Sequence, residues 1–107
     1  MPQARLELLL KTLKTQLQQT LGDQFAAMLL FGSQARAEAW AGSDVDVLVL
    51  LRDEFDFGAV RRRTSETIAD LSLENDVVIS TVFAPLNRYQ QQNSPFFLNV
   101  RREGRFI

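Results

Sequence analysis

The sequence contains no histidine and no cysteine, and both absences restrict the chemistry that the chain can perform. Without cysteine, neither disulfides nor thiolate metal sites can form. Without histidine, the chain lacks the commonest general base, any serine–histidine nucleophile pair and the commonest zinc ligand. Catalysis by this chain would therefore depend on carboxylates, hydroxyls, arginine and lysine.

Long apolar runs are also missing, because no stretch reaches the ~18 apolar residues that a membrane-spanning helix needs. The first residues lack the charged region and apolar core of a secretory signal. Formal net charge is −1 at pH 7, and the longest basic run, Arg61–Arg63, is interpreted as a solvated helix surface without a function. These features predict a soluble, cytoplasmic protein without membrane contact, and they argue against nucleic acid as a partner.

The length of 107 residues, with 46% hydrophobic and 23% charged residues, is that of one ordinary globular domain, so we expect a single domain over residues 1–107. A chain of this size buries somewhat more than ~60% of the surface that its unfolded form exposes, which permits an independent but small core. We therefore expect a second copy or a partner protein to add contacts. Phe96, Phe97 and Phe106 are candidate contact residues, although packing onto the sheet is their more ordinary use.

Hydrophobic spacing predicts the helices and strands. Leucines recur at intervals of three and four over Leu6–Leu21, which predicts an amphipathic helix. Apolar runs at Phe25–Phe31 and Asp44–Leu51, and a β-branched run at Val77–Phe83, predict three strands. Further helices are expected at three places: after Ser33, over residues 60–73, and from Pro95 to Gly104. This order predicts an α/β (α+β) fold with one small mixed sheet and flanking helices.

Two aspartates at the start of the second predicted strand form the centre of a candidate site. Asp44 and Asp46 are two residues apart, so in a strand their side chains leave the same face, with α-carbons roughly 6.6 Å apart. Two anions this close repel unless a cation lies between them, and hard oxygen ligands suit Mg²⁺, which takes further ligands from water and phosphates. Alone, such a pair is more often a turn that caps its own backbone.

A glycine turn before this pair makes the pattern more specific. Gly32 and Ser33 lie between a strand and a short helix, where the missing Cβ and the helix start favour phosphate. The turn precedes Asp44 by about eleven residues and both fall at strand ends, so one sheet edge can present both. Asp76, just before the third strand, supplies a third carboxylate if the strands are neighbours. It is equally well interpreted as a turn residue, and Glu74 is the alternative third carboxylate.

The segment GSQARAEAWAGSDVDVLVL resembles the GSxARG…SDxDhhV signature of the polymerase β-like nucleotidyltransferase superfamily, especially its minimal members. The resemblance implies a polymerase β-like core that binds ATP with Mg²⁺, in a two-metal site. One departure is Ala37, where the family usually has glycine. When the roles of the family's residues are carried over by position, the resemblance implies metal binding and catalysis by Asp44, Asp46 and Asp76. It implies nucleotide binding by Gly32, Ser33, Arg36 and Ser43.

The resemblance also implies a partner. Such proteins are similar to antitoxins encoded beside HEPN ribonuclease toxins, and some members transfer AMP from ATP to a toxin tyrosine. We therefore expect a nucleotidyltransferase that modifies a hydroxyl of a HEPN-type toxin, as part of a homo- or hetero-oligomer. The alternative is a catalytically silent binding module that neutralises its partner by contact alone. The three candidate carboxylates favour the enzyme.

Overall fold

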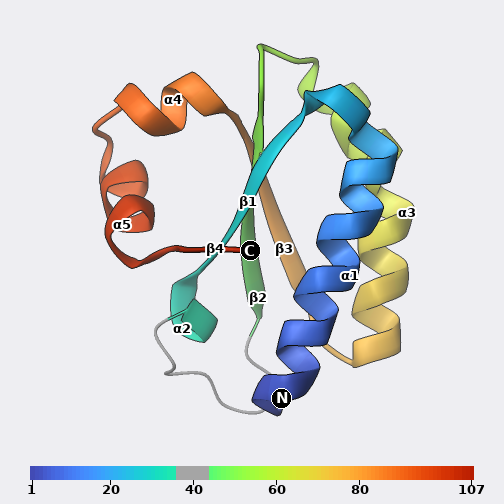
Figure 1. The fold of residues 1–107 in the computed structure, drawn as a ribbon. Coiled ribbons are helices and arrows are strands. Elements are labelled where there is room, and N and C mark those ends of the chain that lie inside the picture. Colours follow the sequence, from blue (N-terminus) through green and yellow to red (C-terminus); the bar gives the residue numbers. More distant parts are fainter. Residues whose placement is uncertain (36–43) are drawn as a thin grey trace.

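The computed structural model describes residues 1–35 and 44–107 (Figure 1). Helices and strands follow one another along the chain in this order: α1 (Gln3–Leu21), a 3₁₀ turn η1 (Gly22–Gln24), β1 (Phe25–Phe31), α2 (Gly32–Ala35), β2 (Val45–Leu51), α3 (Phe57–Asn75), β3 (Ile79–Pro85), α4 (Leu86–Gln91), α5 (Pro95–Glu103) and β4 (Arg105–Phe106). Among the helices of these two ranges, none is long and apolar enough to cross a membrane.

The strands form one mixed sheet in the order β3-β2-β1-β4. β1 runs antiparallel to β2, with Phe31 opposite Asp46. β2 runs parallel to β3, with Asp46 opposite Ser80. This parallel pair needs a crossover connection, which the long helix α3 provides. The short strand β4 pairs antiparallel with β1 on the other side. The mixed sheet with flanking helices confirms the predicted fold class.

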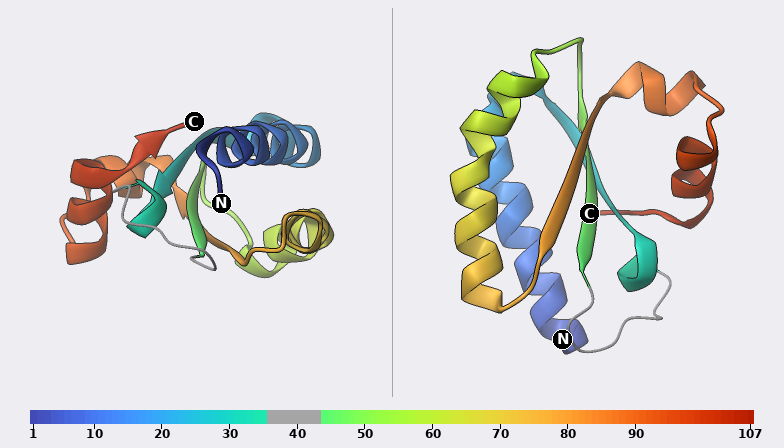
Figure 2. Two further views of the ribbon diagram at one scale, coloured as in Figure 1. Left: turned by 90° about the horizontal axis from the view of Figure 1, so that it is seen from below. Right: turned by 180° about the vertical axis from the view of Figure 1, so that it is seen from behind.

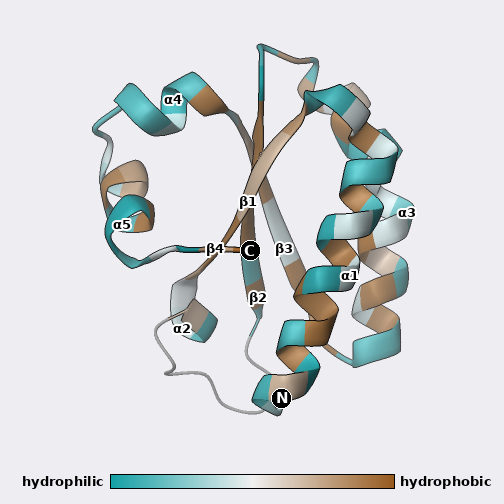
Figure 3. Ribbon diagram, in the orientation of Figure 1, coloured by the Kyte–Doolittle hydropathy of each residue, from teal (hydrophilic) through white to brown (hydrophobic). Residues whose placement is uncertain are grey.

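Helices cover both faces of the sheet (Figure 2). α1 and α3 lie on one face, where leucines of α1 pack against Val45, Val47 and Val49 of β2. α4 and α5 lie on the other face, where Phe97 packs with Leu48 and other residues of β1 and β2. Hydrophobic residues accordingly run through both central strands (Figure 3). Because side chains alternate along a strand, Asp46 emerges on the α4–α5 face, opposite Val45.

Local signals explain where the two long helices begin and end. The six leucines of the predicted spacing are all buried on α1, and Gly22 ends that helix with a φ of +57°. α3 begins at Phe57, three residues before the predicted start, because the side chain of Asp56 accepts a hydrogen bond from the Ala59 N–H at 3.1 Å. α5 begins at the predicted Pro95, where the Ser94 side chain caps it, and it ends at Glu103, directly before Gly104.

Several details differ from the sequence-based expectations. β3 begins at Ile79 rather than Val77, because α3 continues to Asn75 and the Val77 N–H still bonds to the Ser72 carbonyl of that helix. The short helix α4 and the two-residue strand β4 were not predicted. Of the three C-terminal phenylalanines, Phe97 packs against the sheet and is buried, whereas Phe106 is 59% exposed.

Candidate functional site

The glycine turn and the aspartate pair meet at one end of the sheet. Gly32 follows β1 and has a φ of +73°, a conformation that favours glycine. A Cβ added to Gly32 would lie 2.5 Å from Oδ2 and 3.3 Å from Cγ of Asp46, so only the absence of a side chain lets the two approach. The antiparallel register, with Phe31 opposite Asp46, produces this contact. Segments that are separate in the sequence therefore place a backbone turn directly against a carboxylate.

Burial and the charge of Asp44 both act on the Asp46 carboxyl. Burial raises the pKa of the Asp46 carboxyl above its ordinary value, and the negative charge of Asp44 raises it further. Asp44 itself is exposed, just before β2, whereas Asp46 is partly covered. A cation between these oxygens would relieve both effects. The pair therefore fits Mg²⁺ in its donor atoms, its charge and its access to solvent.

The third predicted carboxylate, Asp76, lies between α3 and β3 and not within a strand. Asp76 is exposed at the C-terminal cap of α3, in the left-handed conformation with φ 51°, and it ends the helix before β3 starts. Its N–H donates to the Leu73 carbonyl at 3.3 Å. Glu74 is exposed in the last turn of α3, where its carbonyl accepts a hydrogen bond from Arg5. The left-handed cap and the late start of β3 explain why Asp76 does not enter the strand beside β2.

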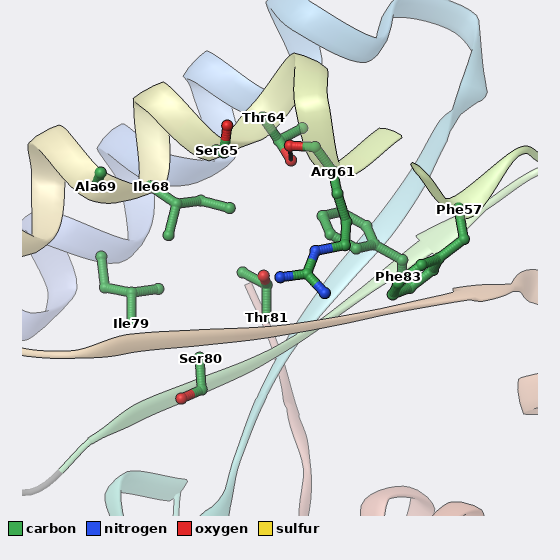
Figure 4. Close-up of a pocket in the computed structure, with 10 residues that line it drawn as sticks. All are labelled: Phe57, Arg61, Thr64, Ser65, Ile68, Ala69, Ile79, Ser80, Thr81 and Phe83. Atoms are coloured by element: carbon green, nitrogen blue, oxygen red, sulfur yellow. Dashed lines mark hydrogen bonds between the residues drawn. The ribbon is translucent and has the colours of Figure 1, made fainter. Parts of the chain in front are cut away.

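The residue beside Asp46 on β3 is Ser80. Residues paired across neighbouring strands project from the same face, so the Ser80 side chain lies on the Asp46 side of the sheet. Figure 4 shows it pointing away from Ile79 and Thr81, which face α3. Within residues 1–35 and 44–107, no group of three acidic, histidine or cysteine side chains could hold a metal ion. The register of the described strands therefore adds a serine hydroxyl beside the two carboxylates, and a metal-binding or catalytic role of Asp76 stays a prediction.

The remaining nucleotide-binding candidates are only partly described. Ser33 lies at the start of α2, directly after Gly32, and is half-buried. Arg36 and Ser43 lie outside the described residues. Sequence reasoning missed Ser80, since it is an ordinary polar residue within a β-branched run. Only the register between β2 and β3 distinguishes it.

Comparisons with known proteins agree with this geometry. Residues 11–107 match the model of the family described as polymerase beta, nucleotidyltransferase. No curated protein matches the chain. A crystal structure of a toxin–antitoxin with AMP-PNP superposes with a TM-score of 0.62 at 19% identity, covering 90% of this chain and 70% of that one.

Two mutant structures of the toxin–antitoxin MntA–HpeT are similar as well. One has a tyrosine replaced by alanine, with a TM-score of 0.58 at 20% identity over 91% of this chain and 70% of that one. The other has two aspartates replaced by glutamates, with a TM-score of 0.59 at 17% identity over 90% and 70%. At these identities the likeness shows a shared fold. Because the family model includes the Gly32 turn, the Asp44–Asp46 pair and most of the chain, the protein belongs to the polymerase β-like nucleotidyltransferase family.

Proposed function

We propose that the chain is a Mg²⁺-dependent nucleotidyltransferase that transfers AMP from ATP to a hydroxyl of a partner toxin, and thereby acts as an antitoxin. The acceptor in this proposal is a tyrosine of a HEPN-type toxin, as the family resemblance implies. The observation that carries the proposal is the contact between Gly32 and Asp46, which joins a phosphate-binding type of turn to a carboxylate pair. Neither element alone would support it.

Each residue of the site has a defined task in this reaction. Asp44 and Asp46 hold Mg²⁺, and the backbone after Gly32 approaches the triphosphate where no side chain intervenes. Bound Mg²⁺ supplies neutralisation of the triphosphate charge and activation of the acceptor hydroxyl. The acceptor oxygen bonds to the α-phosphorus, the bond from that phosphorus to the bridging oxygen breaks, and pyrophosphate leaves. The hydroxyl proton passes to solvent or to a carboxylate.

The neighbouring structures support the choice of nucleotide and partner. One neighbour is a toxin–antitoxin with AMP-PNP, an analogue of ATP, and two others are toxin–antitoxin mutants. These facts concern the neighbours, and the shared fold makes ATP and a toxin the first substrates to test on this chain.

The experiment is transfer of α-³²P-labelled AMP from ATP to the partner toxin, with Mg²⁺, by wild type and by Asp46→Asn. We expect transfer by wild type and a loss of about 10²-fold or more for the variant. Asp70→Asn, an exposed position on α3, is the matched control and should behave as wild type. Undiminished transfer by Asp46→Asn, or none by folded wild type, would overturn the enzymatic proposal.

A second candidate function is neutralisation of the toxin by contact alone. The observation that favours it is Ser80 beside Asp46, which leaves the described site with only two carboxylates. The double variant Asp44→Asn/Asp46→Asn separates the candidates when it is expressed with the toxin. Growth equal to that with wild type would establish neutralisation by contact, whereas loss of protection with a folded variant would support the enzyme.

A further inference from the structure

β3 is the last strand on its side of the sheet, and its outer edge carries backbone groups that no described strand uses. The Val45 N–H donates to the Val78 carbonyl at 2.9 Å, which fixes the orientation of the strand. In a parallel pair the backbone groups of alternate residues point the same way, so Ser80 and Val82 face β2. Thr81 and Phe83 therefore direct an N–H and a carbonyl outward. Such an edge is a template for a further strand.

A groove of about 380 Å³ lies beside this edge, between α3 and β3 (Figure 4). Both elements contribute side chains to it: Arg61, Thr64 and Ile68 from α3, and Ile79, Thr81 and Phe83 from β3. The groove is on the face of the sheet opposite to Asp46, because Ser80, the neighbour of Asp46, points away from it. A ligand in the groove would therefore leave the candidate nucleotide site accessible.

Arg61 gives the groove a positive charge. In Figure 4 its side chain runs from α3 toward Thr81, and its guanidinium carbon lies 5.6 Å from the centre of the Phe57 ring. No acidic residue is among those that line the groove. The other arginines of this run are directed elsewhere, since Arg63 bonds to Gln24 and to the Thr20 carbonyl, while an Arg62 nitrogen lies next to Gly58. Only Arg61 of the three faces the groove.

We propose that the β3 edge and this groove bind an extended, acidic segment of a partner protein as an added β-strand. Its backbone pairs with the outward groups of Thr81 and Phe83. Its alternate side chains enter the groove, where a carboxylate pairs with Arg61 and an apolar side chain contacts Ile68 and Phe83. A second copy of this chain suits the edge less well, because residues 79–85 contain no acidic residue to pair with Arg61.

The test uses seven-residue peptides with glutamate at the centre, valine, isoleucine or phenylalanine two positions to either side, and threonine between them. Binding to the full chain is measured by fluorescence anisotropy. We expect Arg61→Glu to weaken binding by about tenfold or more, and a peptide with lysine in place of glutamate to restore it. Arg62→Glu, the same charge change outside the groove, should stay within about twofold of wild type. Equal binding by Arg61→Glu would refute the proposal.

A second variant tests the strand itself. Proline is tolerated on an edge strand at a position whose backbone N–H points to solvent. Thr81→Pro therefore removes an outward donor and leaves the hydrogen bonds to β2 intact. We expect about tenfold weaker binding, and slower amide exchange at Phe83 when peptide is bound to wild type. Failure of every acidic peptide to bind below about 1 mM would refute the proposal. A dimer of wild type in analytical ultracentrifugation that Thr81→Pro dissociates would also refute the proposal, because a second copy would then occupy the β3 edge.

Discussion

Gly32 stands so close to Asp46 that a Cβ on the glycine would lie 2.5 Å from the carboxylate oxygen. Position 32 requires glycine for two separate reasons. Its φ is positive, and a side chain would collide with Asp46. The contact also leaves no room for a side chain between the turn and the Asp46 carboxylate, so a larger residue at position 32 should displace that carboxylate.

Gly32→Ala should therefore impair both folding and ligand binding. Alanine at φ +73° costs about 1–2 kcal/mol, and its methyl group would displace the Asp46 carboxylate. Urea unfolding should show reduced stability, and calorimetry should show loss of Mg²⁺-dependent ATP binding.

Gly22→Ala is the matched control, because its φ is +57° but nothing lies within 4 Å of an added Cβ. It should lose stability and retain ATP binding. If Gly32→Ala bound ATP as well as Gly22→Ala does, the close approach would have no functional importance.

Asp46→Asn should make the metal-free protein more resistant to heat at neutral pH. Burial and the Asp44 charge raise the pKa of Asp46 in the folded state, so ionised Asp46 favours unfolding. A group with a raised pKa stabilises the folded state at pH values below its pKa in the unfolded state, about 3.9. This contribution is lost as the pH rises through its pKa in the folded state. The advantage of the variant should thus shrink as the pH is lowered.

Thermal unfolding in the presence of a chelator, over a series of pH values, measures this difference. A variant that is less stable than wild type at neutral pH would contradict the assigned cause of the pKa shift. Adding Mg²⁺ should then raise the melting temperature of wild type more than that of Asp46→Asn.

Asp76→Gly should separate a structural role of Asp76 from the predicted catalytic one. Glycine suits the left-handed cap at φ 51°, so the change should stabilise the protein by up to about 1 kcal/mol. Because Asp76 caps α3 and lies outside β3, the strand that pairs with Asp46, we expect AMP transfer to be retained. A fall in transfer of about 10²–10⁴-fold with intact ATP binding would instead establish Asp76 as the third carboxylate. Ser80→Ala provides the comparison at the position beside Asp46.

Glu7 and Arg105 connect α1 to β4, with Nη2 and Oε1 2.6 Å apart. The hydrogen bond and the charge of Arg105 hold the pKa of Glu7 below its ordinary value. The Arg105 and Glu7 side chains are 45% and 40% exposed, so solvent weakens the ion pair and Glu7→Gln should cost at most about 1 kcal/mol. A group with a lowered pKa stabilises the folded state at pH values above its pKa in the unfolded state. This contribution is lost as the pH falls through its pKa in the folded state. The free energy of unfolding, measured with urea, should therefore decrease more between neutral and acid pH for wild type than for Glu7→Gln.

The sequence predicted those parts of the fold whose signals are local. The apolar run Phe25–Phe31 has the limits of β1, and the leucine spacing identified the buried side of α1. Register between distant strands has no such signal, because a β-branched run such as Ile79–Phe83 can pair in several ways. The sequence therefore indicated a carboxylate before β3 but could not show that Ser80 is the residue paired with Asp46.

Calorimetric titration of ATP into the folded protein, with and without Mg²⁺, tests the central claim most directly, since the claim is that Gly32, Asp44 and Asp46 form one metal–nucleotide site. We predict binding by wild type that requires Mg²⁺, and its loss in Asp44→Asn and Asp46→Asn but not in Asp70→Asn. Equal ATP affinity with and without Mg²⁺, and in wild type and both variants, would contradict the account. The absence of ATP binding by folded wild type would contradict it too.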